Sequence, residues 1–238
     1  MSTIPSDLPD AKMVGAVIVA AGASTRMAGV DKTFAPLRGE PLIAHAVDAF
    51  ERCSAVGTIV LVVAEASQDE ASRLVKRRKW RKVHAVAPGG LRRQDSVASG
   101  MAALPPCEWV VVHDGARPLV TPVLITDGLK EVAVTGAAIA AVPSKDTVKV
   151  VGARGEVEFT PDRQEIWITQ TPQVFNRALL EWVHGQVKTE ATDDAAMVER
   201  MGVPVRVFMG SYTNIKVTTP EDLLVAEVLM AGQKRGGG

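Results

Sequence analysis

The sequence has few aromatic residues, only two cysteines and no excess of charge of either sign. Phe, Trp and Tyr make up 4% of the 238 residues, and 27 Lys and Arg residues balance 27 Asp and Glu residues. A balanced chain lacks the overall positive field of a nucleic-acid-binding domain, so no nucleic-acid partner is expected and local cations must attract any anionic ligand. Cys53 and Cys107 lie far apart and match no metal-ligand spacing, which favours buried thiols in a reducing compartment.

Long apolar runs are missing as well. The longest ones have the length of a β-strand, well below that of a membrane span. Residues 1–12 are polar and lack the apolar stretch of a secretory signal. We therefore expect a cytoplasmic protein with no membrane partner. Hydrophobic residues make up 47% of the chain, enough for one domain, which we place at residues 13–232 between flexible tails at 1–12 and 233–238.

What the sequence does contain is a regular alternation of β-branched segments with helical patterns. This alternation is typical of an α/β fold with a mostly parallel sheet flanked by helices. The predicted strands are 14–20, 58–63, 83–86, 109–112, 137–142, 167–171 and 205–209. The predicted helices begin near 41, 69, 94, 122, 176 and 193, and a last one follows Thr219 as its N-cap. The strand at 109–112 is apolar enough to lie at the centre of the sheet.

The alternation breaks at residues 145–159. Two short segments of alternating polar and apolar residues flank a glycine-bearing turn at 152–155, a pattern that predicts a β-hairpin. An isolated hairpin is only marginally stable in water. We therefore expect this protruding arm, residues 145–162, to pack on a second subunit.

The first candidate for a ligand site is the loop from Ala20 to Met27, with Lys32 shortly after it. It follows the first strand, at the edge where open α/β sheets bind ligands. Its small residues allow main-chain N–H groups to approach a triphosphate, and Arg26 and Lys32 add positive charge. It is neither a Walker A loop nor a dinucleotide fingerprint, because no Gly-Lys-Ser/Thr and no G-x-G-x-x-G occurs. An ordinary turn with solvated cations explains the same residues about equally well.

The second candidate is segment 113–118, His-Asp-Gly-Ala-Arg-Pro, at the end of the predicted central strand. Asp114 and Arg117 would face the same crevice as the first loop, and an arginine can bind phosphate through two parallel hydrogen bonds. The alternative is a turn in which Asp114 caps the chain and Arg117 pairs with it. His113 is more typical of a buried, hydrogen-bonded histidine than of a catalyst.

Weaker signals lie elsewhere in the chain. The glycine pair that ends at Gly90, with Ser96 in the next helix, can bring main-chain and hydroxyl groups against a base. Lys216 precedes the last helix, Arg163 follows the arm and Thr171 follows the next strand. An ordinary loop, a solvated lysine or packing of the hairpin would explain each of them as well.

Taken together, these segments form one pattern. It consists of Ala20-Ala21-Gly22-x-Ser24-x-Arg26-Met27, Lys32, His113-Asp114-x-Ala116-Arg117-Pro118, Asp146-Thr147-Val148-Lys149, Gln170-Thr171-Pro172-Gln173, Thr192-Asp193-Asp194 and Asn214-Ile215-Lys216-Val217-Thr218. In this pattern the chain resembles the 2-C-methyl-D-erythritol 4-phosphate cytidylyltransferase family of the non-mevalonate isoprenoid pathway. The resemblance covers nearly all of residues 14–230, and so many motifs in register are very hard to obtain by chance.

The resemblance implies a Rossmann-like nucleotide-diphospho-sugar transferase fold and the transfer of CMP from CTP to 2-C-methyl-D-erythritol 4-phosphate, giving 4-diphosphocytidyl-2-C-methyl-D-erythritol and pyrophosphate. It implies a homodimer joined by the arm, and Mg²⁺ held mainly by the CTP phosphates rather than by a protein metal site. The implied catalytic residues are Arg26, Lys32, Lys216 and Arg163, the last acting in the neighbouring subunit's site. The implied CTP-binding residues are Ala20, Ala21, Gly22, Gly90 and Ser96. Those implied for the sugar-alcohol phosphate are Asp114, Arg117, Thr147, Arg163, Thr171, Thr192 and Lys216.

Two positions depart from the family pattern. Gly115 stands where a second alanine is usual, and Leu91 stands where polar residues are common, so only its main-chain groups are available to the base. Two other functions stay open. One is a cytidylyltransferase for ribitol 5-phosphate, which shares much of this motif set and differs at the acceptor pocket. The other is a module that binds CTP without turnover, although the retained cations argue against it.

Overall fold

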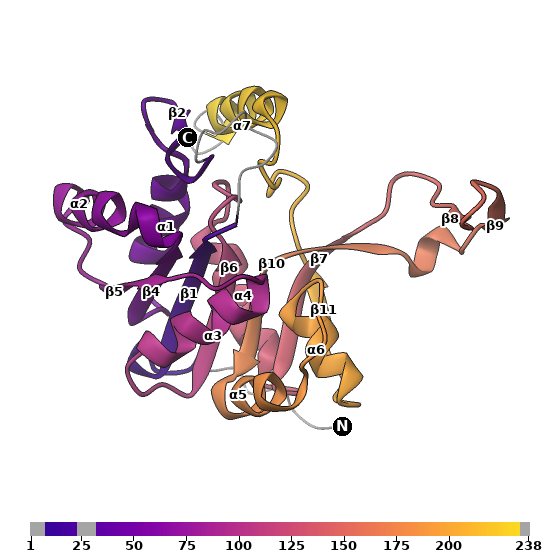
Figure 1. Cartoon of the computed structure of the whole chain (residues 1–238), viewed down its shortest axis with the longest axis horizontal. Helices are drawn as coiled ribbons and strands as arrows, with labels where there is room; N and C mark the ends of the chain where they lie inside the picture. Colours follow the sequence, from indigo (N-terminus) through magenta and orange to yellow (C-terminus); the bar gives the residue numbers. More distant parts are fainter. Residues whose placement is uncertain (1–7, 23–31, 234–238) are drawn as a thin grey trace.

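The computed structural model describes residues 8–22 and 32–233. Its main sheet contains β1 (Val14–Ala20), β4 (Thr58–Val63), β5 (Val83–Pro88), β6 (Trp109–Asp114), β7 (Ala137–Pro143), β10 (Trp167–Asn176) and β11 (Arg206–Met209). The strand order is β11-β7-β10-β6-β1-β4-β5 (Figure 1). Neighbouring strands are parallel except that β10 runs antiparallel to both β6 and β7. The predicted mostly parallel sheet is confirmed, and β6 is its middle strand, as predicted.

Helices cover both faces of this sheet. On one face lie α1 (Leu42–Arg52), α2 (Gln68–Arg78) and α4 (Pro122–Val132), and on the other α3 (Arg93–Ala103), α5 (Arg177–Gln186) and α6 (Asp194–Arg200). Alternate residues of a strand point to opposite faces. In β1, Ile18 therefore joins the first core layer and Val17 the second.

The last helix, α7 (Pro220–Gln233), packs on a third and smaller apolar cluster, and Figure 1 shows it beside β2. The buried members of this cluster are Leu37, Leu42, Ala116, Leu119, Val217 and Ala226. Thr219 caps the helix as predicted, because its Oγ1 accepts from the N–H of Asp222 (3.4 Å). The Asp222 carboxylate accepts in return from the N–H of Thr219 (2.9 Å), which completes a reciprocal capping arrangement.

A small hairpin that the sequence pattern does not indicate lies just before α1. Its strands, β2 (Pro36–Leu37) and β3 (Glu40–Pro41), are joined by Arg38 and Gly39, whose φ angles are 52° and 82°. Two successive positive φ angles give a tight turn whose twist suits a hairpin. Asn or Asp is the usual first residue of such a turn, so an arginine there hides the hairpin from sequence analysis.

β10 is longer than predicted. The predicted strand ended at residue 171, yet β10 continues through Pro172 to Asn176, although a proline cannot donate to a strand ladder. The register against β7 shifts between Thr169 and Gln173, so the proline lies at an irregular point of the ladder. β7 and β10 are antiparallel because the arm connects them directly as a hairpin.

The arm protrudes from the β7–β10 pair (Figure 1). Near its tip β8 (Val150–Val151) pairs antiparallel with β9 (Val157–Phe159), and Gly155 turns the chain with a φ of 81°. The predicted hairpin is thus confirmed. Large apolar side chains at the arm and its root are exposed, namely Val151, Val157, Phe159, Trp167 and Ile168.

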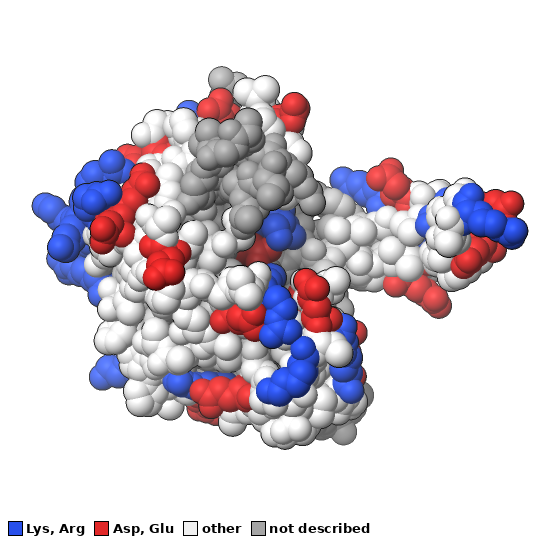
Figure 2. Space-filling model, viewed as in Figure 1, with Lys and Arg blue, Asp and Glu red and all other residues white. Residues whose placement is uncertain are grey.

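The visible surface carries both signs of charge in close mixture, with a group of basic side chains over α2 (Figure 2). The last turn of α2 contains Lys76, Arg77 and Arg78. Among the described residues, no helix has the length and apolar character needed to cross a bilayer. The predicted boundary between the first tail and the domain falls inside a short 3-10 helix, η1 (Ala11–Met13).

Candidate active site

A crevice at the carboxyl ends of β1 and β6 is set by the path of the chain. β4 and β5 follow β1 on one side, and β6 then pairs with β1 on the other side. Such a switch point is where open α/β sheets bind ligands. A larger cavity of about 440 Å³ and a smaller one of about 250 Å³ lie there and share part of their walls.

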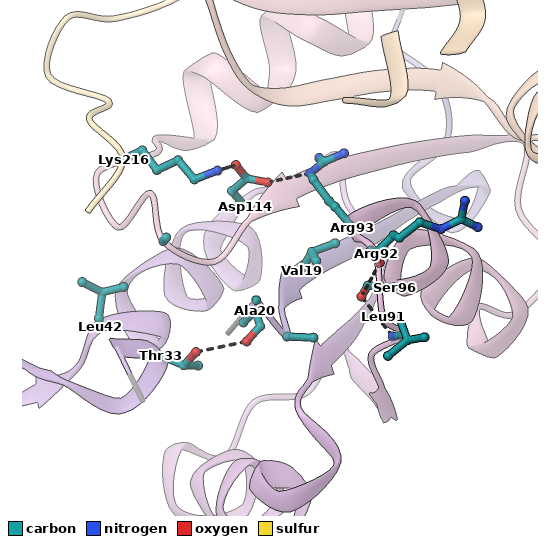
Figure 3. A pocket seen from close by; sticks show the side chains of 14 residues that line it. Val19, Ala20, Thr33, Leu42, Leu91, Arg92, Arg93, Ser96, Asp114 and Lys216 are labelled. Carbon is teal, nitrogen blue, oxygen red and sulfur yellow. Dashed lines mark hydrogen bonds and ion pairs between the residues drawn. The ribbon is translucent and has the colours of Figure 1, made fainter. Parts of the chain in front are cut away.

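All the residues predicted to bind CTP line the larger cavity (Figure 3), namely Ala20, Ala21, Gly22, Gly90 and Ser96. The short 3-10 helix η2 (Lys32–Phe34) is tied to this wall, because the Thr33 hydroxyl donates to the Ala20 carbonyl (3.1 Å). Of the predicted catalytic cations, Arg26 lies outside the described residues and Lys32 is described only as backbone in η2. Their approach to the cavity stays a prediction.

The glycine pair brings two loops into direct contact. A Cβ on Gly89 would lie 2.0 Å from the Cβ of Ala21, so a larger residue could not take its place without moving the backbone. The N–H of Gly90 donates to the Ser96 Oγ (3.1 Å), and the Ser96 hydroxyl can donate to the Arg92 carbonyl (3.2 Å). Ser96 therefore shapes the loop in this structure, and its contact with a base stays a prediction.

Asp114 lies where the two cavities meet, between two cations (Figure 3). Lys216 Nζ lies 2.7 Å from Asp114 Oδ2, and Arg93 Nε lies 3.2 Å from Asp114 Oδ1. Burial alone would raise the pKa of Asp114, but the charges of Arg93 and Lys216 outweigh it and hold that pKa well below its ordinary value. The carboxylate is thus ionised at every physiological pH.

The smaller cavity collects most of the residues predicted for the acceptor, namely Asp114, Arg117, Thr171, Thr192 and Lys216. Arg117 donates from Nη1 to the Asn214 carbonyl (2.7 Å) and from Nη2 to the Thr169 carbonyl (3.4 Å). The turn of the alternative interpretation exists, since the N–H of Arg117 donates to the Asp114 carbonyl (2.9 Å). The Arg117 side chain, however, rests on neutral carbonyls, so its charge is available to an anion in this cavity.

A hydrogen-bond chain behind Asp114 fixes the protonation of His113. Burial lowers the pKa of His113 to about 4, so the ring is neutral near pH 7. Its Nε2 lies 3.2 Å from the Arg117 carbonyl, which can only accept, so Nε2 carries the proton and Nδ1 accepts from the Thr171 hydroxyl (3.0 Å). The Thr171 Oγ1 accepts in turn from the N–H of Asp114 (3.0 Å). His113 is buried and hydrogen-bonded, as predicted.

Two predicted site residues lie on the arm instead of at the cavities. Thr147 is exposed, and Arg163 begins the 3-10 helix η4 (Arg163–Glu165) and donates from Nη1 to the Lys145 carbonyl (3.3 Å). Neither residue lines the larger or the smaller cavity. Within one chain they are therefore not brought together with the other predicted residues.

Three residues at the site had no role assigned from the sequence: Arg93, which lies in no predicted motif, and Gln173 and Asp194, which lie in predicted motifs. Arg93 Nη1 lies 2.6 Å from Asp194 Oδ2, and Gln173 Nε2 donates to the N-cap residue of α6, Asp193 (2.7 Å). For Arg93 the signal was its position. A cation in the first turn of a helix interacts unfavourably with the helix dipole, which suggests that the arginine has a role other than stabilising the helix. For Asp194 the signal was its place beside Thr192 in a predicted motif.

A divalent cation would find few protein ligands in the larger cavity. In the described part of the chain, no group of three or more His, Cys, Asp or Glu side chains could hold a metal ion. Among the described residues of the cavity wall, Asp114 is the one carboxylate, and both of its oxygens already face cations.

Comparisons with known proteins agree with this geometry. Residues 14–232 match the family described as 2-C-methyl-D-erythritol 4-phosphate cytidylyltransferase. A protein of that name from Dehalococcoides mccartyi strain 195 is 50% identical over 217 residues, which are 91% of this chain and 96% of the relative. Another from Desulforamulus reducens is 45% identical over 221 residues, 90% of this chain and 94% of the relative.

Solved structures give the same result. The 4-diphosphocytidyl-2C-methyl-D-erythritol synthase of Anaerococcus prevotii superposes with a TM-score of 0.84 at 30% identity, covering 93% of this chain and 97% of that one. The 2-C-methyl-D-erythritol 4-phosphate cytidylyltransferase of Thermus thermophilus gives 0.75 at 28% identity, covering 90% and 98%.

Proposed function

We propose that each of the two cavities binds one of the two substrates of a single reaction. Because the chain belongs to the 2-C-methyl-D-erythritol 4-phosphate cytidylyltransferase family, it transfers CMP from CTP to 2-C-methyl-D-erythritol 4-phosphate and releases pyrophosphate. CTP occupies the larger cavity and the acceptor phosphate the smaller one. The observation that supports this division most directly is the shared wall. Arg93, Asp114 and Lys216 line both cavities, so groups bound on either side meet at the Asp114–Lys216 pair.

The reaction is an in-line attack by an acceptor phosphate oxygen on the α-phosphorus of CTP, with pyrophosphate leaving. A phosphate monoester is largely ionised near neutral pH, so no general base is required. The difficulty is to bring two polyanions together and to stabilise the charge that develops at the α-phosphorus. Positioning and fixed positive charge therefore dominate. In this proposal Lys216 acts between the substrates, Arg117 holds the acceptor phosphate, and Arg26 and Lys32 contact the triphosphate.

The remaining contacts divide in the same way. Main-chain groups of Ala20, Ala21 and Gly22 face the CTP phosphates, while the Gly90 loop and Ser96 face the cytosine. Asp114 and Thr192 bind the acceptor beside Thr171, whose hydroxyl holds the Asp114 backbone in place. The cavity positions of these residues support the assignment.

Mg²⁺ is the proposed cofactor, and when bound it neutralises phosphate charge. Within the described cavity wall, Asp114 is the single carboxylate, and it is engaged by Lys216 and Arg93. An ion at this site would therefore be held mainly by the CTP phosphates.

We also propose a homodimer in which the arm of one subunit completes the site of the other. The exposed apolar side chains of the arm, including Val157 and Phe159, support this arrangement, because a hairpin of this size is marginal without a surface to pack on. Arg163 and Thr147 would then act in the partner's site. The free thiols of Cys53 and Cys107 suit the reducing cytoplasm.

The shared site predicts recovery of activity on mixing two defective proteins. Arg163→Ala and Lys32→Ala dimers should each be nearly inactive. In a hybrid dimer one site has an intact Lys32 from its own chain and an intact Arg163 from the partner. After complete subunit exchange at equal concentrations, pyrophosphate release should reach about a quarter of the wild-type rate, since half of the dimers are hybrids with one complete site. No recovery after exchange has been verified by mass spectrometry would place Arg163 in its own chain's site.

The substrate assignment is tested by measuring pyrophosphate release with CTP, Mg²⁺ and 2-C-methyl-D-erythritol 4-phosphate. Parallel reactions replace the acceptor with ribitol 5-phosphate or CTP with UTP. We expect rapid release in the first mixture alone. Faster release with ribitol 5-phosphate would keep the cavities and the mechanism but reassign the acceptor, and CTP binding without release in any mixture would indicate a non-catalytic module.

A further inference from the structure

Arg93 connects two carboxylates that lie on different elements. Its Nε faces Asp114 at the end of β6 (3.2 Å), and its Nη1 faces Asp194 at the start of α6 (2.6 Å). Asp194 is fully buried, and its other oxygen lies 3.1 Å from His184 Nε2. A chain of polar contacts therefore runs from His184 through Asp194 and Arg93 to Asp114.

Stability does not explain this arrangement. Arg93 is the first residue of α3, where a cation opposes the helix dipole. Burying a guanidinium and two carboxylates carries a large desolvation cost. The Nη2 group is also buried and has no hydrogen-bond partner among the described residues. One donor group of the guanidinium is thus left unpaired within the described part of the chain. The positions of the two carboxylates therefore determine the orientation of the Arg93 guanidinium.

The location of the chain of contacts indicates what it does. Arg93 follows the glycine-pair loop of the larger cavity, and Asp194 follows Thr192 of the smaller cavity. Arg93 contacts Asp114, which lies where the cavities meet, and Asp194 is connected to Asp114 through Arg93. Burial would lower the pKa of Arg93, but Asp194 and Asp114 raise it, so the guanidinium stays charged. The same charge, with the hydrogen bond from His184, outweighs burial and lowers the pKa of Asp194.

We propose that Arg93, braced from behind by Asp194, is a positioning residue that sets the orientation of the Asp114 carboxylate for the hydroxyl groups of the sugar-alcohol acceptor. One carboxylate oxygen of Asp114 is held by Arg93, and the other is left beside Lys216 at the cavity. This inference rests on the proposed assignment of Asp114 to the acceptor. Lysine cannot replace Arg93, because a single ammonium cannot reach two carboxylates with the geometry of a guanidinium.

The test uses Arg93→Lys, which keeps the charge, and Asp194→Asn, which keeps the volume. Arg93→Lys should raise the KM for the acceptor on the order of tenfold, while the KM for CTP changes less than about twofold. Asp194→Asn should shift the acceptor KM in the same direction by a smaller factor. In an Asp114→Asn background, Arg93→Lys should add almost nothing, because it acts through the carboxylate that is already lost.

Arg177→Lys is the matched control. Arg177 is also the first residue of its helix, α5, and its side chain is 19% exposed against 22% for Arg93. It donates to Glu181 and to the carbonyls of Pro105 and Met101, and it lines neither cavity. Its replacement should lower the melting temperature and leave both KM values unchanged.

The outcomes separate the inference from the assignment beneath it. If Asp114→Asn leaves the acceptor KM unchanged, the assignment of Asp114 fails and the inference fails with it. If Asp114→Asn raises that KM but Arg93→Lys does not, only the inference fails. Equal shifts in both KM values, or effects of Arg93→Lys and Asp114→Asn that multiply in the double variant, would reduce Arg93 to a residue that supports the fold.

Discussion

Lys216→Ala should lower kcat/KM by on the order of a thousandfold. Removing one preorganised donor from a reacting centre costs on the order of a hundred- to a thousandfold, and Lys216 lines both cavities, so its ammonium faces both proposed substrates. The loss of Lys216 would also remove one of the two cations beside the Asp114 carboxylate and leave Arg93, whose Nε lies 3.2 Å from Asp114 Oδ1. The less compensated negative charge of Asp114 would then face an incoming anion. Steady-state kinetics with CTP and acceptor varied in turn would measure the effect.

Two comparisons make this experiment decisive. Lys76→Ala, in the last turn of α2, removes an exposed lysine away from both cavities and should leave the kinetics unchanged. Lys216→Arg restores the charge with a different geometry and should recover only part of the activity. A folded Lys216→Ala protein with kcat/KM within about threefold of wild type would remove Lys216 from the reacting centre.

Lys32→Ala should lower kcat at least on the order of a hundredfold, the scale of losing one fixed positive charge near the leaving pyrophosphate. The backbone supports this, because η2 is tied to the end of β1 through the Thr33–Ala20 hydrogen bond. Single-turnover pyrophosphate release separates this loss from any change in CTP binding. Lys76→Ala again serves as the control, and near-wild-type turnover of folded Lys32→Ala would contradict the role in catalysis.

The sheet could be predicted because its signals are local. The apolar run of β6 predicts a strand covered on both faces, and such a strand can only lie inside the sheet. The reciprocal bonds between Thr219 and Asp222 likewise follow from residues three apart. The ends of the strands were harder to predict. Pro172 argues against a strand at its position, yet β10 pairs with β7 on both sides of this proline.

The site was predicted only as far as single loops allow. Residues after β1 and β6 meet because parallel strands place their carboxyl ends on one edge, so Ala20 and Asp114 could be assigned to one crevice. The contact between Arg93 and Asp194 joins residues 101 positions apart and depends on how α3 and α6 pack. No local pattern contains that information. Thr171 shows the same limit, because its bonds to Asp114 and His113 appear only once β10 lies beside β6.

The place of Lys216 beside α7 has a consequence for how the enzyme fails on heating. Val217, the next residue, is fully buried in the third apolar cluster, and its N–H donates to the Ala116 carbonyl (2.8 Å). On α7 itself Ala226 is fully buried, Leu223, Leu229 and Met230 pack on the cluster while partly buried, and Leu224 and Val228 are exposed, so this helix is attached through a small cluster rather than through either main core layer. Segments held in this way open locally at a lower free energy than the whole domain. Each such opening would free the anchor of Lys216 while the sheet stays folded, so catalysis would be lost at a temperature where the secondary structure is still nearly complete.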